Sequence, residues 1–147
     1  MKNLHTLEEL QEEATSFIKN LSPKETGATL VTLSGELGAG KTAFTQAVAK
    51  ALGIKDIVTS PTFVLLKEYE VTGTLQKSFS KLIHVDAYRL EGKSCEPLEL
   101  RTYLSHRENL VCIEWPAMLG ETLPMADVKI TLKVKEGTVR EISYDYA

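Results

Sequence analysis

A glycine-rich segment between an expected strand and an expected helix constrains the fold of this chain more than any other feature. Residues 29–33 are β-branched and apolar, as in a buried strand, and residues 42–52 have the apolar spacing of a helix that ends near Gly53. The segment between them follows the pattern G-x-x-x-x-G-K-S/T, with the residues Gly35, Glu36, Leu37, Gly38, Ala39, Gly40, Lys41 and Thr42. In this context the pattern predicts a phosphate-binding loop, called the P-loop below.

The chemistry of such a loop explains its residue types. Glycines allow successive backbone N–H groups to point into one concavity, and the amino terminus of the following helix adds partial positive charge. Lys41 would reach the β- and γ-phosphates of a nucleotide, and the Thr42 hydroxyl would contact a magnesium ion. The flanking strand and helix argue against the alternative, a glycine-rich turn with a surface lysine. We therefore expect a nucleoside triphosphate to bind here with Mg²⁺.

The rest of the chain alternates helical and strand patterns. Before the P-loop, apolar residues recur at helical spacing over residues 7–21, and Thr6 with Glu9 forms an expected capping box. After the P-loop helix, an antiparallel hairpin is expected within residues 63–79, with its turn near Gly73. Further along, two apolar runs predict central strands around a helix, and two alternating segments predict a last hairpin: residues 82–86, 98–104, 110–115, 128–134 and 139–144.

This order predicts an α/β fold. We expect a single P-loop NTPase domain over residues 1–147, because a chain of this length is the size of one compact domain. Its central sheet should be mainly parallel and flanked by helices, with an antiparallel carboxyl-terminal hairpin on the sheet's edge.

Two acidic residues end the two expected central strands. Asp86 closes the first run and Glu114 closes the second. Phosphoryl transfer needs a carboxylate for magnesium or for the attacking water, normally at the carboxyl end of a neighbouring strand. Either acid alone could equally be a solvated strand end, but two of them in a phosphate-binding domain favour function. His84 shares a strand face with Asp86, and a satisfied core histidine is the favoured interpretation of it.

Two further segments leave alternatives open. Pro61 holds Ser60 in an extended conformation, so the segment around Ser60 and Thr62 is either a connector or a switch loop whose hydroxyls sense the γ-phosphate. Arg89 could neutralise phosphate charge or pair with a surface acid such as Glu91.

Composition excludes several classes of protein. Lys and Arg total 17 against 20 for Asp and Glu, and the resulting net charge of −3 disfavours independent binding of RNA or DNA. Cys95 and Cys112 are far apart and lack neighbouring ligands, so we expect two reduced thiols and neither a zinc site nor a redox pair. The first residues do not have the pattern of a secretory signal, and no run approaches the roughly 20 apolar residues of a membrane span. We expect a cytoplasmic protein without membrane contact.

Four motifs, in this order, resemble those of the bacterial TsaE (YjeE) ATPases. They are the P-loop at 35–42, Ser-Pro-Thr-Phe at 60–63, His-Val-Asp-Ala-Tyr-Arg-Leu at 84–90 and Ile-Glu-Trp-Pro at 113–116. The resemblance covers most of residues 6–146. It implies a small magnesium-dependent ATPase, with ADP as product, that is required for threonylcarbamoyl modification of the adenosine beside the anticodon in tRNAs that read codons beginning with A. The implied partners are TsaD and TsaB; TsaD performs the transfer, and tRNA is met only through the complex.

The resemblance also implies roles for individual residues. Lys41 and Thr42 would contact phosphate and magnesium, Glu114 would be a metal-site acid, and Asp86 a catalytic or second metal-site acid. Trp115 would lie beside the site. ATP would also lie near the start of the first helix and near a carboxyl-terminal strand, where the matching residues are Thr6 and Arg140. The sequence departs from the family pattern at Ala43, where a second threonine is usual, and at Ala117, where an acidic or amide residue is usual.

Two other functions are alternatives to an ATPase that acts on partner proteins. A small-molecule kinase shares the P-loop and the sheet, but it needs an acceptor site and usually an arginine-rich lid, and this chain has little length to spare for one. A nucleotide-gated binding module with incidental hydrolysis differs mainly in whether turnover depends on partners. A GTPase is disfavoured because the sequence contains neither an Asn-Lys-x-Asp nor an Asp-x-x-Gly motif, so we expect ATP over GTP.

Overall fold

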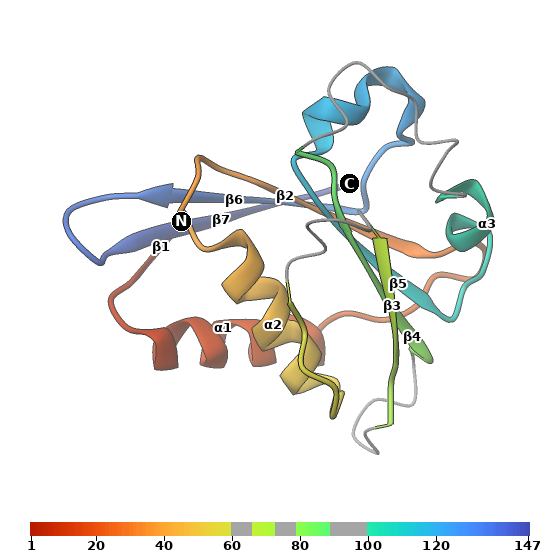
Figure 1. The fold of residues 1–147 in the computed structure, drawn as a ribbon, viewed down its shortest axis with the longest axis horizontal. Coiled ribbons are helices and arrows are strands. Elements are labelled where there is room, and N and C mark those ends of the chain that lie inside the picture. The colour runs from red at the N-terminus through yellow and green to blue at the C-terminus, as the bar shows by residue number, and fades with distance from the viewer. Residues whose placement is uncertain (60–65, 73–78, 89–99) are drawn as a thin grey trace.

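A computed structural model describes residues 1–59, 66–72, 79–88 and 100–147 (Figure 1). Seven strands form one sheet in the order β1-β7-β6-β2-β5-β4-β3. The described elements, in chain order, are β1 (Lys2–Leu4), α1 (Leu7–Lys19), β2 (Thr29–Ser34), α2 (Lys41–Ala51), β3 (Leu66–Glu70), β4 (Lys81–Asp86), α3 (Leu100–Leu104), β5 (Asn109–Glu114), the 3-10 helix η2 (Pro116–Thr122), β6 (Val128–Val134) and β7 (Arg140–Tyr146).

The centre of the sheet is parallel. β2 pairs in parallel with β5 on one side and with β6 on the other, and β4 extends the parallel set beyond β5. Antiparallel pairs lie outside this centre, between β6 and β7, β7 and β1, and β3 and β4. The predicted α/β fold with a mainly parallel sheet and a carboxyl-terminal hairpin is therefore confirmed. The hairpin is not at the edge, however, because β1, which the sequence did not predict, covers β7.

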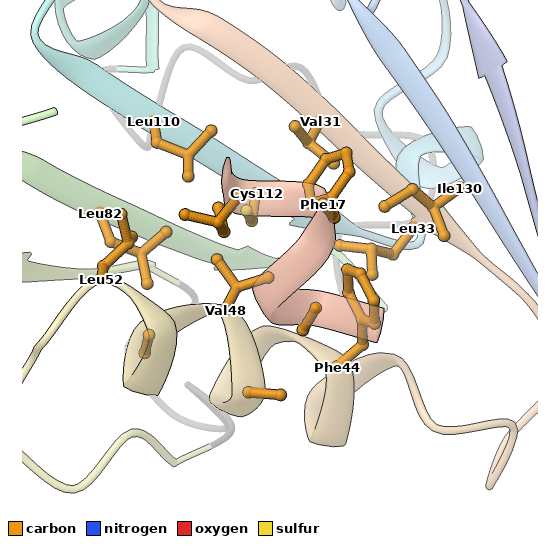
Figure 2. Close-up of a cluster of buried hydrophobic side chains, with 14 of the residues drawn as sticks. Phe17, Val31, Leu33, Phe44, Val48, Leu52, Leu82, Leu110, Cys112 and Ile130 are labelled. Atoms are coloured by element: carbon orange, nitrogen blue, oxygen red, sulfur yellow. The ribbon is translucent and has the colours of Figure 1, made fainter. Parts of the chain in front are cut away.

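Helices cover both faces of the sheet (Figure 1). α1 and α2 pack on one face, and α3 with η2 packs on the other, each over its own cluster of buried apolar side chains. Figure 2 shows the first cluster, in which Phe44 and Val48 of α2 lie beneath Leu33 and Cys112 of the sheet. Phe17 of α1 completes it, with its ring centroid 5.8 Å from that of Phe44. This packing holds the start of α2 against the sheet, next to the P-loop.

The cap of α1 follows the predicted capping box with one difference. Thr6 is the N-cap residue, and its hydroxyl accepts a hydrogen bond from the Glu9 backbone N–H at 3.1 Å. The Glu9 carboxylate accepts from the backbone N–H of His5, at 2.6 Å, and not from that of Thr6. Both bonds satisfy backbone donors at the chain's entry into the helix.

The first predicted hairpin is described only in part. β3 pairs antiparallel with β4, with Leu66 opposite Val85. The turn expected near Gly73 and most of the return strand expected from about residue 74 are not among the described residues. Residues 73–78 lie outside the described residues, as do residues 60–65. The helix expected at 98–104 is confirmed over its described part, α3.

Two expectations from composition can be compared with the described ranges. Cys112 is a buried free cysteine, and burial raises the pKa of its thiol to about 12, as expected of an unreactive core residue. Cys95 lies outside these ranges. In the part of the chain that the structure describes, no helix is long and apolar enough to cross a membrane.

At Gly35, the backbone of β6 leaves no room for a side chain in the P-loop. Its φ is +152°, and a Cβ built there would lie 2.3 Å from the carbonyl oxygen of Leu132 in β6. We expect Gly35→Ala to lower the free energy of unfolding by about 2 kcal/mol or more, because β6 backbone must shift. Gly38→Ala is the matched control: its φ is +79°, but no atom lies within 4 Å of the added Cβ. Urea denaturation of both variants measures the difference, and equal losses would contradict this account.

Candidate functional site

The carboxyl ends of three strands meet at one edge of the sheet. Glu114, the last residue of β5, lies opposite Leu33 of β2 on one side and opposite Asp86 of β4 on the other. The Trp115 N–H continues this edge by donating to the Leu33 carbonyl at 3.2 Å. The two acids that were singled out in the sequence are therefore neighbours, and they lie where β2 enters the P-loop.

The P-loop leads directly into α2. Gly40 is the N-cap residue in a left-handed conformation, with φ of 107°, and no side chain caps the helix. The first turn of α2 contains no acidic residue. The start of α2 thus offers uncapped backbone N–H groups and the positive end of the helix dipole, as an anionic phosphate requires.

Lys41 is held inside the loop. Its side-chain nitrogen donates to the carbonyl oxygens of Gly35 at 2.7 Å and Glu36 at 2.8 Å, and only 5% of the residue is exposed. The same nitrogen lies 4.2 Å from the centre of the Trp115 ring. Burial lowers the pKa of Lys41, and the negative charges of Glu114 and Asp86 oppose that shift. An arriving phosphate would supply the counter-charge that neutral carbonyls and a ring supply only weakly.

Thr42 and Glu114 form a pair of oxygen donors. The Thr42 hydroxyl is 2.9 and 3.1 Å from the two carboxylate oxygens of Glu114, which is itself 2% exposed. Hydroxyl and carboxylate oxygens are the donors that Mg²⁺ prefers, and the ion usually takes few protein ligands because waters and phosphates complete its shell. No group of three or more His, Cys, Asp or Glu that could hold a metal occurs among the described residues. This sparse set of donors fits Mg²⁺ that arrives with a nucleotide.

Asp86 differs from Glu114 in its surroundings. It is half-buried, and one of its carboxylate oxygens accepts a hydrogen bond from the Tyr88 backbone N–H at 3.1 Å. The Tyr88 ring packs on Trp115, with the centroids 4.9 Å apart. Asp86 thus lies at the accessible side of the site, near Lys41, whereas Glu114 lies at its buried side.

A cavity of about 290 Å³ adjoins the P-loop. Arg140 of β7 lies in its wall and donates to the Gly38 carbonyl at 3.3 Å and to the Gly137 carbonyl at 3.1 Å. Thr6 is part of the same wall, so the pairing of β1 with β7 brings together two predicted residues from opposite ends of the chain. The residues that line the cavity are Leu4, His5, Thr6, Leu7, Leu10, Gly38, Ala39, Gly40, Ala43, Thr138 and Arg140.

The two departures from the family pattern lie in different surroundings. Ala43 lines this cavity with a methyl group where a hydroxyl is usual, whereas Ala117 is exposed in η2. The predicted switch residues Ser60 and Thr62 lie outside the described residues, as does Arg89.

Two residues of the site, His84 and Trp115, were not assigned a chemical role from the sequence. His84 is fully buried, as the sequence favoured, and its ring nitrogen Nε2 lies 2.6 Å from the Glu114 carboxylate. Its position on the same strand face as Asp86, at the start of the motif at 84–90, was the available signal for this contact. Trp115 has a left-handed backbone, with φ of 60°, which is rare for a bulky residue and turns its ring over Lys41.

Comparisons with known proteins agree on one family. The sequence model described as "Threonylcarbamoyl adenosine biosynthesis protein TsaE" matches residues 4–142. The chain is 42% identical over 115 residues to the tRNA threonylcarbamoyladenosine biosynthesis protein TsaE of Bacillus subtilis. The aligned residues cover 78% of this chain and 68% of that protein. It is 30% identical over 141 residues to the protein of the same name from Rickettsia typhi, and the aligned residues cover 95% of this chain and 90% of that protein. The crystal structure of YdiB from Bacillus subtilis superposes with a TM-score of 0.73 at 29% identity, covering 97% of this chain and 82% of that one.

The position of Lys41 generates a prediction. We expect Lys41→Ala to weaken the binding of a nucleoside triphosphate by about 100-fold or more, because it removes the cation held inside the loop and its charge-assisted bonds. Lys50→Ala, an exposed lysine of the same helix, is the matched control and should bind as the unchanged protein does. Calorimetric titration gives both affinities. Equal affinities for the two variants would show that phosphate binds elsewhere.

Proposed function

The chain belongs to the TsaE family, and we propose that it is a magnesium-dependent ATPase that acts in threonylcarbamoyl modification of tRNA. In this proposal it acts on a complex of TsaD and TsaB homologues, and it meets tRNA only through that complex. It hydrolyses ATP slowly alone and faster with its partners, and it is not the threonylcarbamoyl transferase. The observation that carries the proposal is the contact of Thr42 with the buried Glu114, directly beside the enclosed Lys41.

Each part of the nucleotide has a place in this proposal. The backbone N–H groups of the P-loop and the start of α2 bind the phosphates, and Lys41 exchanges its bonds to the Gly35 and Glu36 carbonyls for bonds to phosphate oxygens. The cavity beside Thr6 and Arg140 takes the nucleoside part, since it adjoins the loop and is lined mainly by apolar atoms with a few polar groups.

Hydrolysis needs a stabilised phosphoryl group and an oriented water. Mg²⁺, when bound, would neutralise charge on the phosphate oxygens, and Thr42 and Glu114 are the residues that would hold it. Asp86 orients the attacking water, because it is the more accessible of the two acids and lies opposite Glu114 on the adjacent strand. Lys41 stays beside the transferred group and balances its charge.

Dependence on partners separates this proposal from its rivals. We expect addition of purified TsaD and TsaB homologues to accelerate the release of inorganic phosphate from ATP, and ATP to increase their recovery in a pull-down with this protein. Lys41→Ala is the control and should abolish both effects. A kinase would instead transfer phosphate to a small molecule, and a binding module would show recovery without acceleration. Either result would contradict partner-driven hydrolysis.

The two acids should have separable roles. We expect Glu114→Gln to weaken nucleotide binding only when magnesium is present, because the charge that would hold the ion is lost. We expect Asp86→Asn to leave binding nearly intact and to slow the chemical step by a factor on the order of 10² to 10⁴. Calorimetry with and without Mg²⁺, beside single-turnover hydrolysis with the partner pair, measures both quantities. The reverse pattern would exchange the two roles, and no change in either variant would refute the mechanism.

A further inference from the structure

We propose that His84 is a positioning residue of the site, which holds the Glu114 carboxylate in the orientation that Thr42 and magnesium require. His84 is fully buried in β4, with 0% exposure, and its Nε2 lies 2.6 Å from one carboxylate oxygen of Glu114. The mechanism proposed above gives this histidine no role. The inference rests on the proposed function, because the orientation matters only if Glu114 serves a metal ion.

The geometry indicates which ring nitrogen carries the proton. A lone pair on Nε2 directed at a carboxylate oxygen 2.6 Å away would bring two acceptors together inside the protein, which is unfavourable. Nδ1 has no hydrogen-bond partner among the described residues. A proton on Nδ1 would therefore be a buried donor without a described acceptor, whereas a proton on Nε2 makes a charge-assisted bond. The Nε2–H tautomer satisfies both atoms better.

The contact is diagonal across the sheet. His84 lies opposite Cys112 in the register of β4 and β5, and Glu114 is two residues further along β5 on the same face. Diagonal neighbours of this kind are within reach of long side chains. His84 therefore approaches Glu114 from the interior of the sheet, while Thr42 approaches it from α2.

Two donors restrict a side chain that would otherwise have several rotamers. Thr42 alone shares its hydroxyl between both oxygens of Glu114, at 2.9 and 3.1 Å, which leaves the carboxylate free to turn about that contact. The bond from His84 selects one oxygen and fixes the plane of the group. Carboxylates that serve metal ions commonly have such hydrogen-bonded supports, whose removal weakens metal affinity or activity by about 10- to 100-fold.

The tautomer can be observed without nucleotide. Long-range ¹H–¹⁵N spectra of the intact protein should show the His84 ring as the Nε2–H form, with a slowly exchanging proton. In Glu114→Gln the resonance of that proton should shift, because its acceptor loses its charge. An Nδ1–H tautomer, or a resonance that Glu114→Gln does not move, would overturn the proposed bond.

Two amide variants test the role of the bond. In His84→Gln the side-chain nitrogen can occupy the place of Nε2, whereas in His84→Asn it reaches only the place of Nδ1. We expect His84→Asn to weaken magnesium-dependent binding of a non-hydrolysable ATP analogue by about 10- to 100-fold and to leave magnesium-free binding unchanged. His84→Gln should recover most of the loss. Calorimetry with Mg²⁺ and with a chelator measures both.

A control separates positioning from folding. Leu82 lies on the same face of β4, two residues before His84, and is equally buried. It lies opposite Leu110, four residues before Glu114 in β5. Leu82→Ala should lower the melting temperature but retain the magnesium dependence. Equal magnesium dependence in His84→Asn and the unchanged protein would overturn the inference alone, as would equal losses in His84→Gln and His84→Asn. Absence of magnesium dependence in the unchanged protein would instead overturn the proposed function.

Discussion

The parallel pairing of β5 with both β2 and β4 determines where the two acids of the site lie relative to the P-loop. Because the three strands end level, Glu114, Asp86 and the entry to the P-loop share one edge of the sheet. α2 packs on the sheet through Phe44 and Val48 (Figure 2). This packing brings Thr42 within hydrogen-bond distance of Glu114. Burial of apolar side chains away from the site therefore supplies the free energy that holds a row of polar groups in place.

The charged side chains of Lys41 and Glu114 are buried at this edge, where burial disfavours their charged forms. Lys41 is buried, and its ordinary bonding partners are uncharged, so desolvation lowers its pKa although two acids lie nearby. A site of this kind is poised for an anion: a phosphate would relieve the cost of burying the lysine, and a divalent cation would relieve that of Glu114. Nucleotide and metal would thus stabilise the site jointly, each supplying what the other side chain lacks.

The sequence predicted the parts of this site that depend on local patterns. A strand, eight P-loop residues and a helix are contiguous, and alternation along short apolar runs was enough to place Asp86 and Glu114 at strand ends. It did not predict the contact of His84 with Glu114, which depends on the register of two strands far apart in the chain. Nor did it predict β1, a three-residue strand whose pairing with β7 has no local signal. Nor did it predict that β3 pairs with β4, since pairing is decided across the sheet.

The wall of the cavity beside the P-loop comes from both ends of the described fold, with Thr6 after β1 and Arg140 in β7. During synthesis on the ribosome, β2, the P-loop and α2 emerge long before β7, so an early chain has phosphate-binding residues but no completed wall beside them. In the proposed function, a nucleotide would gain its full set of contacts only after β7 has joined the sheet. Binding would then stabilise molecules in which β7 has joined the sheet over those in which it has not, which couples occupancy of the site to formation of this part of the sheet.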